Sequence, residues 1–367
     1  MTDLSITTVV AGSGFLAGVV FGAVANRTNF CTMGAISDIV LMGDWRRMRA
    51  WLLAIGIAIL ATQTMSAVGM IDLSKAIYLT PNFGWLGAII GGLLFGFGMT
   101  MAGGCANKTL IRIGGGNIKS VVVLLVLGVF ADMTHRGLIA IGRVQMEAAT
   151  NVNLANRGLT SQGLPDILTK LTGITPSVTR WLVAGPLAGA LLLFCLGDRD
   201  FRSSPSHVIA GVVIGLLIPA GWWITGVLGN DDFSPTALTS FTFVAPIGDS
   251  VQYLMTFSGS TINFGIATVG GVIVGSFLAA IATRKFQIEG FKDTDDTVRH
   301  MIGAAIMGIG GVMALGCTIG QGLTGMSTLS AGSLIAILSI ISGGVLGMKY
   351  LEEGSFSGAL VAVLARG

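Results

Sequence analysis

The chain has 367 residues, of which 52% are hydrophobic and 11% are charged, and its mean hydropathy is +0.81. A water-soluble domain carries about 25% charged residues, so this composition excludes an ordinary soluble globular protein. The net charge of +3 is spread along the chain without a basic tail, and nucleic acid is therefore not an expected partner.

Long uncharged tracts indicate membrane-spanning helices. Five of them contain no Asp, Glu, Lys or Arg: 50–71, 76–107, 203–230, 250–283 and 300–348. Each is long enough for one helix of about 20 residues, and the last is long enough for two. Strands of a membrane barrel would alternate every second residue in short segments, and these tracts do not. The expected fold class is an all-α polytopic membrane protein.

We expect about nine transmembrane helices, near residues 7–25, 50–71, 84–103, 118–134, 181–197, 207–228, 262–283, 300–315 and 331–349. Four shorter apolar segments lie between them, at 29–42, 106–115, 241–255 and 318–328. They are too short to cross a bilayer and too apolar for solvated loops. Such segments are typical of re-entrant or broken helices that are buried in protein or line a cavity. The polar stretch 136–180 is expected to be a soluble loop with helical pieces.

The two halves of the chain are predicted to form an internal repeat. A shift of 212 residues places Cys105 on Cys317, and a shift of 213 places Phe30 on Phe243. Residues 1–135 would be the first repeat, with four spans and two short segments. Residues 136–206 contain the polar loop and a joining span, and 207–367 would be the second repeat. Because a single span joins the halves, we expect the second repeat to be inverted in the membrane.

The distribution of basic residues supports this inversion through the positive-inside rule. With the N-terminus outside and the C-terminus cytoplasmic, the short outer loops carry little besides Lys75, whereas most Arg and Lys residues fall in inner loops. Corresponding loops also exchange their charge: three basic residues surround the loop after Cys105, and none lies in 318–331. Inverted repeats commonly frame a binding site near the membrane midplane.

Three of the four cysteines lie beside predicted helix breaks. Cys31 follows Asn29-Phe30, Cys105 follows two glycines, and Cys317 follows Gly316. A thiol is a weak donor and a soft acceptor, and the N-termini of broken helices attract anions. This combination suits a soft anion such as a sulfur oxyanion, and it also suits a soft metal such as Cu(I).

Copper is the weaker alternative because no methionine cluster lies beside these cysteines, and their spacing indicates neither a zinc site nor a redox pair. Cys195, in the joining span, is expected to be a small apolar filler.

Polar residues close to the cysteines complete the candidate site. Four of them are expected to contact the oxygen atoms of an anion: Asn107, Lys108, Thr318 and Gln321. Three aspartates fall near membrane depth, where ionisable residues are functional candidates: Asp38, Asp132 and Asp249. The alternative for these aspartates is pairing with a basic residue, for which Arg27, Lys108 and Arg112 are the expected partners.

The same motifs resemble a known family. Arg27-x-x-Phe30-Cys31, Gly103-Gly104-Cys105-Ala106 and Gly316-Cys317-Thr318-Ile319-Gly320-Gln321-Gly322-Leu323 are similar to motifs of the YeeE/YedE family of sulfur transporters, in the same order along the chain. The resemblance extends over essentially the whole sequence. It implies an hourglass-shaped protein of the bacterial inner membrane, with thiosulfate passing along Cys31, Cys105 and Cys317 by S–H···S contacts. It also implies a separate cytosolic TusA-like sulfur carrier as a partner.

The expected function is therefore uptake of thiosulfate or a related sulfur anion by a multi-pass protein embedded in membrane lipid, without enzymatic activity, metal or cofactor. One branch of the family is linked to selenium, so a selenium compound is an alternative substrate. A membrane sulfurtransferase that carries sulfur as a cysteine persulfide is the competing class. That enzyme would need an activated thiolate, and no histidine or carboxylate is adjacent in sequence to any of the three cysteines.

Overall fold

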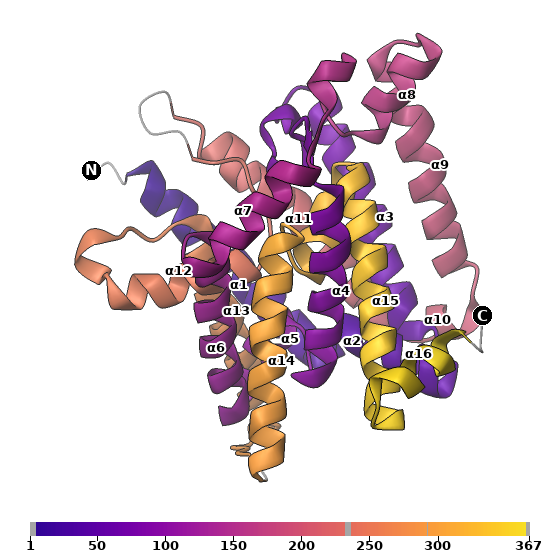
Figure 1. The fold of residues 1–367 in the computed structure, drawn as a ribbon. Helices are drawn as coiled ribbons and strands as arrows, with labels where there is room; N and C mark the ends of the chain where they lie inside the picture. Colours follow the sequence, from indigo (N-terminus) through magenta and orange to yellow (C-terminus); the bar gives the residue numbers. More distant parts are fainter. Residues whose placement is uncertain (1–4, 232–235, 292, 365–367) are drawn as a thin grey trace.

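The computed structural model describes residues 5–231, 236–291 and 293–364. Nine long helices form a bundle (Figure 1): α1 (Ile6–Thr28), α3 (Arg46–Ala67), α4 (Trp85–Met101), α6 (Ile118–His135), α9 (Pro176–Leu196), α11 (Pro205–Trp223), α13 (Phe264–Ala282), α14 (Thr294–Met313) and α15 (Ala331–Glu353). Eight of them belong to segments long and apolar enough to cross a membrane. The ninth, α14, has 20 residues and carries the charged residues Asp295 and Asp296 in its first turn. The expected all-α polytopic fold is confirmed.

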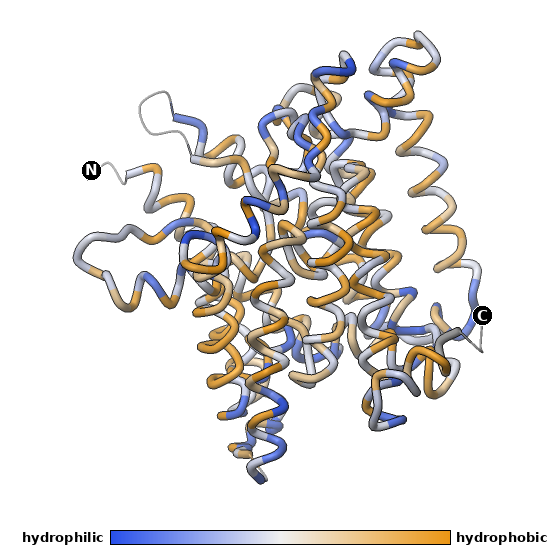
Figure 2. The backbone as a smooth tube through the Cα atoms, in the orientation of Figure 1, coloured by the Kyte–Doolittle hydropathy of each residue, from blue (hydrophilic) through white to orange (hydrophobic). Residues whose placement is uncertain are grey.

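The surface of the bundle is suited to lipid. Figure 2 shows apolar residues along the long helices and polar residues concentrated toward their ends and in the connecting loops. Large aliphatic side chains point outward, and Leu193 on α9 and Leu338 on α15 are 76% and 56% exposed. Exposed apolar residues in such number are unfavourable in water and are favourable against hydrocarbon chains.

Glycines let the central helices approach each other closely. A Cβ atom placed on Gly98 of α4 would lie 2.7 Å from the carbonyl oxygen of Gly303 on α14. On the next face of α4, a Cβ atom on Gly92 would lie 2.9 Å from the carbonyl oxygen of Ala336 on α15. Without side chains at these positions the backbones pack directly, which is how apolar helices associate inside a membrane.

The long helices pack in a reciprocal pattern. Helix α1 packs against α13, and α11 packs against α3. Likewise α4 packs against α15, and α6 packs against α14. The remaining central contacts join α4 to α14 and α1 to α11. Helix α9 lies at the edge of the bundle beside α3 (Figure 1).

Short helices occupy the four segments expected to be broken or re-entrant. Helix α2 (Thr32–Ser37) continues into the π-helical turn η1 (Asp38–Met42), and α5 (Ala106–Gly114) follows α4. Helix α12 (Val244–Met255) lies between α11 and α13. The last segment is helical from 318 to 327 and includes the π-helical stretch η7 (Gly320–Gly325). These elements bring backbone N-termini into the middle of the bundle.

The stretch between α6 and α9 contains the expected helical pieces, α7 (Leu138–Thr150) and α8 (Leu164–Thr172). It also contains strand β2 (Val152–Asn153), which pairs antiparallel with β1 (Asn82–Phe83). Strand β1 lies before α4 and follows two single helical turns, η2 (Leu73–Lys75) and η3 (Ile77–Leu79). The turn at 162–164 of the α6–α9 stretch is hydrogen-bonded to the start of α15, because Ala331 N donates to Gln162 O at 3.1 Å. The stretch is therefore docked on the bundle. Five further short elements are η4 (Leu154–Arg157), α10 (Arg199–Arg202), η5 (Ile224–Leu228), η6 (Phe257–Gly259) and α16 (Phe356–Leu364).

Candidate functional site

The three cysteines share one local geometry. Two residues before each of them the backbone is left-handed, with φ of 53° at Asn29, 68° at Gly103 and 57° at Leu315. The next amide then bonds back to the carbonyl five residues earlier, as Gly104 N does to Met99 O at 2.8 Å. This is the hydrogen bond of a Schellman motif, which ends a helix and turns the chain. A cysteine follows each turn and starts a short helix.

The thiols lie at the N-termini of these short helices. The Cys31 Sγ accepts a hydrogen bond from Gly34 N at 3.5 Å, and the Cys317 Sγ accepts one from Gly320 N at 3.4 Å. Cys105 occupies the same N-cap position on α5. Cys31 is 4% exposed, and Cys105 and Cys317 are fully buried. The N-terminal amides and the helix dipole make each position favourable for an anion.

The cysteines approach one another from different parts of the chain. The side chains of Cys31 and Cys105 lie near each other, and Cys317 lies within electrostatic range of Cys105. All are free thiols. Within the described ranges, no group of three or more His, Cys, Asp or Glu side chains is close enough to hold a metal ion. Cys195 lies elsewhere, buried on α9 with its Sγ 3.2 Å from Arg49 O.

Buried polar atoms without a hydrogen-bond partner lie beside the cysteines. They are the Oγ1 atoms of Thr32 and Thr318, both amide atoms of Asn107 and Oε1 of Gln321. A buried polar group left without a partner costs about 1–3 kcal/mol, so such groups are rare in folded proteins. Five of the eleven such atoms among the described residues thus lie within four positions of a cysteine. Thr32 was not expected from the sequence, although Cys31-Thr32 and Cys317-Thr318 are the same dipeptide.

Gln321 presents an acceptor to its surroundings. Its Nε2 donates to Ala314 O at 2.5 Å, which leaves Oε1 as the open atom. This oxygen and the unpaired hydroxyl of Ser333 line a small cavity of about 30 Å³, large enough for one water molecule. In this orientation Oε1 suits a hydrogen-bond donor. The expected contact of Gln321 with an anion's oxygen atom would require the amide to rotate.

Lys108 lies at the other end of the cysteine cluster. Its Nζ donates to Asn29 Oδ1 at 2.9 Å, so it braces the turn that precedes Cys31. Arg112 lies close to the turn before Cys105, because its Nη1 would be 3.4 Å from a Cβ atom on Gly103. In the described part of the chain neither cation forms an ion pair with a carboxylate. This end of the cluster is therefore positively charged.

The three aspartates are paired, but the expected partners were wrong. Asp38 pairs with Arg47 at 3.2 Å, and Asp249 pairs with Arg136 at 2.7 Å. Asp132 is also 3.7 Å from Arg136, four residues later on the same helix end. Arg47 is reached because α2 and the start of α3 fold against each other, and Arg136 because α12 packs on α6. The cations next to the cysteines are thereby left unpaired.

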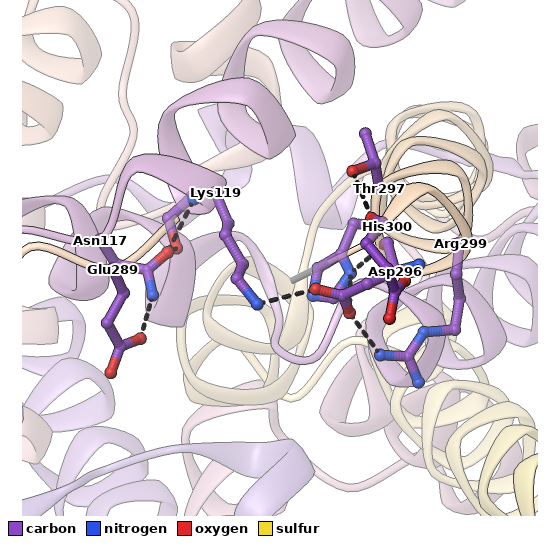
Figure 3. Close-up of polar contacts among 9 residues, drawn as sticks. Asn117, Lys119, Glu289, Asp296, Thr297, Arg299 and His300 are labelled. Atoms are coloured by element: carbon purple, nitrogen blue, oxygen red, sulfur yellow. Dashed lines mark hydrogen bonds and ion pairs between the residues drawn. The ribbon is translucent and has the colours of Figure 1, made fainter. Parts of the chain in front are cut away.

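A polar cluster joins the start of α6 to the start of α14 and the loop before it (Figure 3). Lys119 points from the start of α6 to Asp296, with Nζ 2.7 Å from Oδ2, and Asp296 also pairs with Arg299 at 3.0 Å. Beside this pair, Asn117 Nδ2 donates to Glu289 at 2.5 Å. The cluster joins the end of the Cys105 helix to the loop before α14.

A larger cavity approaches Cys317 from the side of η3 and α12. Its volume is about 440 Å³, and it reaches Gly316, the residue before the cysteine. Its walls include Tyr78, Thr242 and Asp249. We call this cavity the vestibule. It is large enough for a small hydrated anion, whereas the cysteine itself is buried behind it.

A multi-pass helical bundle with broken helices, whose N-termini and thiols meet in a buried polar site, is the architecture of a membrane transporter. The chain belongs to the sulphur transport family, whose model matches residues 27–346. This confirms the family that the three cysteine motifs indicated.

Curated relatives are similar over most of the chain. Thiosulfate transporter TsuA of Escherichia coli (strain K12) is 28% identical over 325 residues, covering 85% of this chain and 86% of that protein. Thiosulfate transporter TsuA of Spirochaeta thermophila (strain ATCC 700085 / DSM 6578 / Z-1203) is 26% identical over 330 residues, covering 87% and 92%. Probable transporter YedE of Escherichia coli (strain K12) is 36% identical over 101 residues, which are 28% of this chain and 23% of that protein.

Proposed function

We propose that this protein takes up thiosulfate, or a closely related sulfur anion, along a pathway that passes Cys317, Cys105 and Cys31. The single observation that carries the pathway is the repeated turn: each thiol starts a buried short helix, with unpartnered polar atoms nearby. The substrate follows from the family and from relatives named as thiosulfate transporters over about 85% of the chain.

The chemistry of thiosulfate suits these groups. Its terminal sulfur is a soft acceptor for an S–H donor, and its oxygen atoms accept stronger hydrogen bonds. The hydroxyls of Thr32 and Thr318 and the amide nitrogen of Asn107 are unpartnered donors placed beside the thiols. Together with the helix N-termini they replace the water lost from the anion, while Lys108 and Arg112 supply positive charge at one end of the cluster only.

We propose that the halves 1–135 and 207–367 are inverted repeats around this pathway. In chain order, the long helices α1, α3, α4 and α6 of the first half correspond to α11, α13, α14 and α15 of the second. Under this correspondence the α1–α13 contact becomes α11–α3, and the α4–α15 contact becomes α14–α6. All four contacts are present. The positive-inside rule then places the N-terminus and the vestibule outside, with Lys108 and Arg112 toward the cytoplasm. The anion would travel from the vestibule toward this positive end.

Uptake of sulfur-labelled thiosulfate into proteoliposomes tests the proposal. Single serine substitutions at Cys31, Cys105 and Cys317 are expected to lower the initial rate at least ten-fold, because a hydroxyl is a harder and smaller partner for sulfur. Cys195→Ser is the matched control, since this thiol is buried on α9 away from the cluster, and its rate should stay within two-fold. Full uptake by all three serine variants would refute the cysteine pathway.

A persulfide mechanism makes a different prediction. It requires one cysteine thiolate to attack the outer sulfur of thiosulfate, which breaks the S–S bond of the anion, releases sulfite and leaves a persulfide on the cysteine. Mass spectrometry of the protein after incubation with thiosulfate would detect this additional sulfur atom as a gain of about 32 Da. We expect no such species. If it forms and is consumed at the rate of sulfur transfer, the protein is a sulfurtransferase.

We also propose that a separate cytosolic TusA-like carrier docks at the positive end, where the imported thiosulfate leaves the pathway. The family resemblance supports this partner, and a carrier has to dock beside Lys108 or on the neighbouring inner loops. Co-purification of such a carrier from detergent extracts, lost at high salt, is the expected result. Equal recovery with an unrelated membrane protein would refute it.

A further inference from the structure

Two cavities meet at a single aromatic residue. The vestibule of about 440 Å³ and the small cavity of about 30 Å³ beside Gln321 have only two lining residues in common, Tyr78 and Leu315. Tyr78 belongs to η3, in the loop between α3 and α4, and it is 4% exposed. Together with Leu315 it therefore lies between the open vestibule and the small cavity beside Gln321.

The hydroxyl group of Tyr78 lies over the start of the Cys317 helix. A Cβ atom on Gly320 would be 2.5 Å from Thr242 Oγ1 and 3.5 Å from the Tyr78 hydroxyl oxygen. The Tyr78 hydroxyl also interacts with the Thr242 side chain. Gly320 is the residue whose amide donates to the Cys317 thiol. The two hydroxyl groups thus cover the N-terminal turn at which the proposed pathway begins.

The position of Tyr78 is well defined. Its ring contacts Trp222 edge to face, with centroids 6.5 Å apart, and the Trp222 Nε1 is fixed by a hydrogen bond to Ser327 Oγ at 3.1 Å. Burial raises the pKa of the phenol above its ordinary value, so the hydroxyl keeps its proton. A neutral phenol donates a hydrogen bond to an arriving anion and does not repel it.

Tyr78 and Thr242 also come from different halves of the chain. Tyr78 follows α3, whereas Thr242 precedes α12, so the two residues are more than 160 positions apart in the sequence. A small movement between the two halves would therefore separate the two hydroxyl groups and uncover the helix start. A contact between two segments so distant in the chain opens when the segments move apart, which is one structural form of a gate.

We infer that Tyr78, held against Thr242, is the gate that controls access from the vestibule to Cys317. This inference rests on the proposed pathway for its biological meaning, but the accessibility of Cys317 is measured without any substrate. The Tyr78 hydroxyl would donate a hydrogen bond to the anion in the vestibule, and the ring would be the barrier.

The test measures the rate at which a charged, membrane-impermeant methanethiosulfonate reagent modifies each cysteine in the full-length protein in proteoliposomes, read by peptide mass spectrometry. Tyr78→Ala removes the barrier, and modification of Cys317 is expected to accelerate at least ten-fold. Modification of Cys31 should change less than two-fold. Tyr253→Ala is the control, because this tyrosine packs on Phe257 outside the vestibule.

Tyr78→Phe keeps the ring and its packing and loses only the hydroxyl contact. It keeps the test decisive if the alanine variant fails to fold. Modification of Cys317 is expected to rise about three-fold in this variant. An unchanged rate at Cys317, or an equal rise at Cys31 and Cys317, would overturn the gate. Faster modification of Cys317 without any thiosulfate uptake by the wild-type protein would refute the proposed substrate and leave the gate standing.

Discussion

Replacing Gly98 by alanine is expected to destabilise the protein, although the same change elsewhere in a helix is favourable. Gly98 lies where α4 crosses α14, and an added Cβ atom would be 2.7 Å from both Gly303 O and Met307 N. These neighbours are backbone atoms of a packed helix, so they cannot rotate away. The helices themselves have to separate.

The size of the effect follows from this distance. An ordinary contact for a Cβ atom begins at 3.4 Å, so the crossing has to widen by about 0.7 Å. A gap of this size removes about a quarter to a half of the dispersion energy between the facing atoms. Overpacking of this kind costs about 1–3 kcal/mol. In a chain of this size that corresponds to a fall in the unfolding temperature of about 2–6 °C.

Gly189 provides the matched control. It lies on α9, and a Cβ atom there would have nothing within 4 Å. Gly189→Ala is expected to stabilise the helix by about 0.5–1 kcal/mol, because alanine restricts the unfolded chain. Fluorescence-detected size-exclusion chromatography after heating measures both variants in detergent. Shifts of the same sign and size for Gly98→Ala and Gly189→Ala would refute the packing argument.

Three further outcomes are expected. Thr32→Val should raise the unfolding temperature by about 1–2 °C, because it removes an unpartnered buried hydroxyl, and should lower thiosulfate uptake at least three-fold; unchanged uptake would contradict a substrate contact. Lys108→Met should lower the initial uptake rate about five-fold and weaken its dependence on ionic strength, whereas Lys285→Met, exposed on the loop after α13, should leave both unchanged. Hydrogen bonds from Arg46 lower the pKa of Asp44 to about 2, so its stabilising effect is present above about pH 4 and lost as the pH falls toward 2. The difference in unfolding temperature between the wild type and Asp44→Asn should therefore be visible at pH 6 and shrink below pH 4, and a difference independent of pH would contradict the assignment.

The amino-acid sequence predicted the parts of this protein that depend on composition and local pattern. Uncharged tracts located the long helices, and short apolar segments beside glycines located the broken ones. The left-handed turn before Cys31 was not anticipated, because the residue that adopts it is Asn29 and not a glycine. Asparagine tolerates this conformation better than most residues, so an Asn two positions before a cysteine was the available signal.

Features that depend on contacts between distant segments could not be predicted from the sequence. Strands β1 and β2 have two residues each, too few to show any alternation. Arg136 was not expected to pair with Asp249, because only the packing of α12 on α6 brings them together. Tyr78 lies in a long uncharged tract, where its hydroxyl carries no pattern that distinguishes it from its apolar neighbours. Its position between two cavities is visible only in the folded chain.

The hydrogen bonds accepted by the cysteine sulfurs decide where their protons point. In Cys31 and Cys317 a lone pair of Sγ is engaged by the amide of Gly34 or Gly320. The S–H bond of each thiol then points in a direction other than that of the engaged lone pair. Each helix start thus orients a proton as well as attracting an anion. A sulfur species that donates a hydrogen bond at the position where the anion accepts one would face amide and thiol donors. The same turns would therefore disfavour its binding.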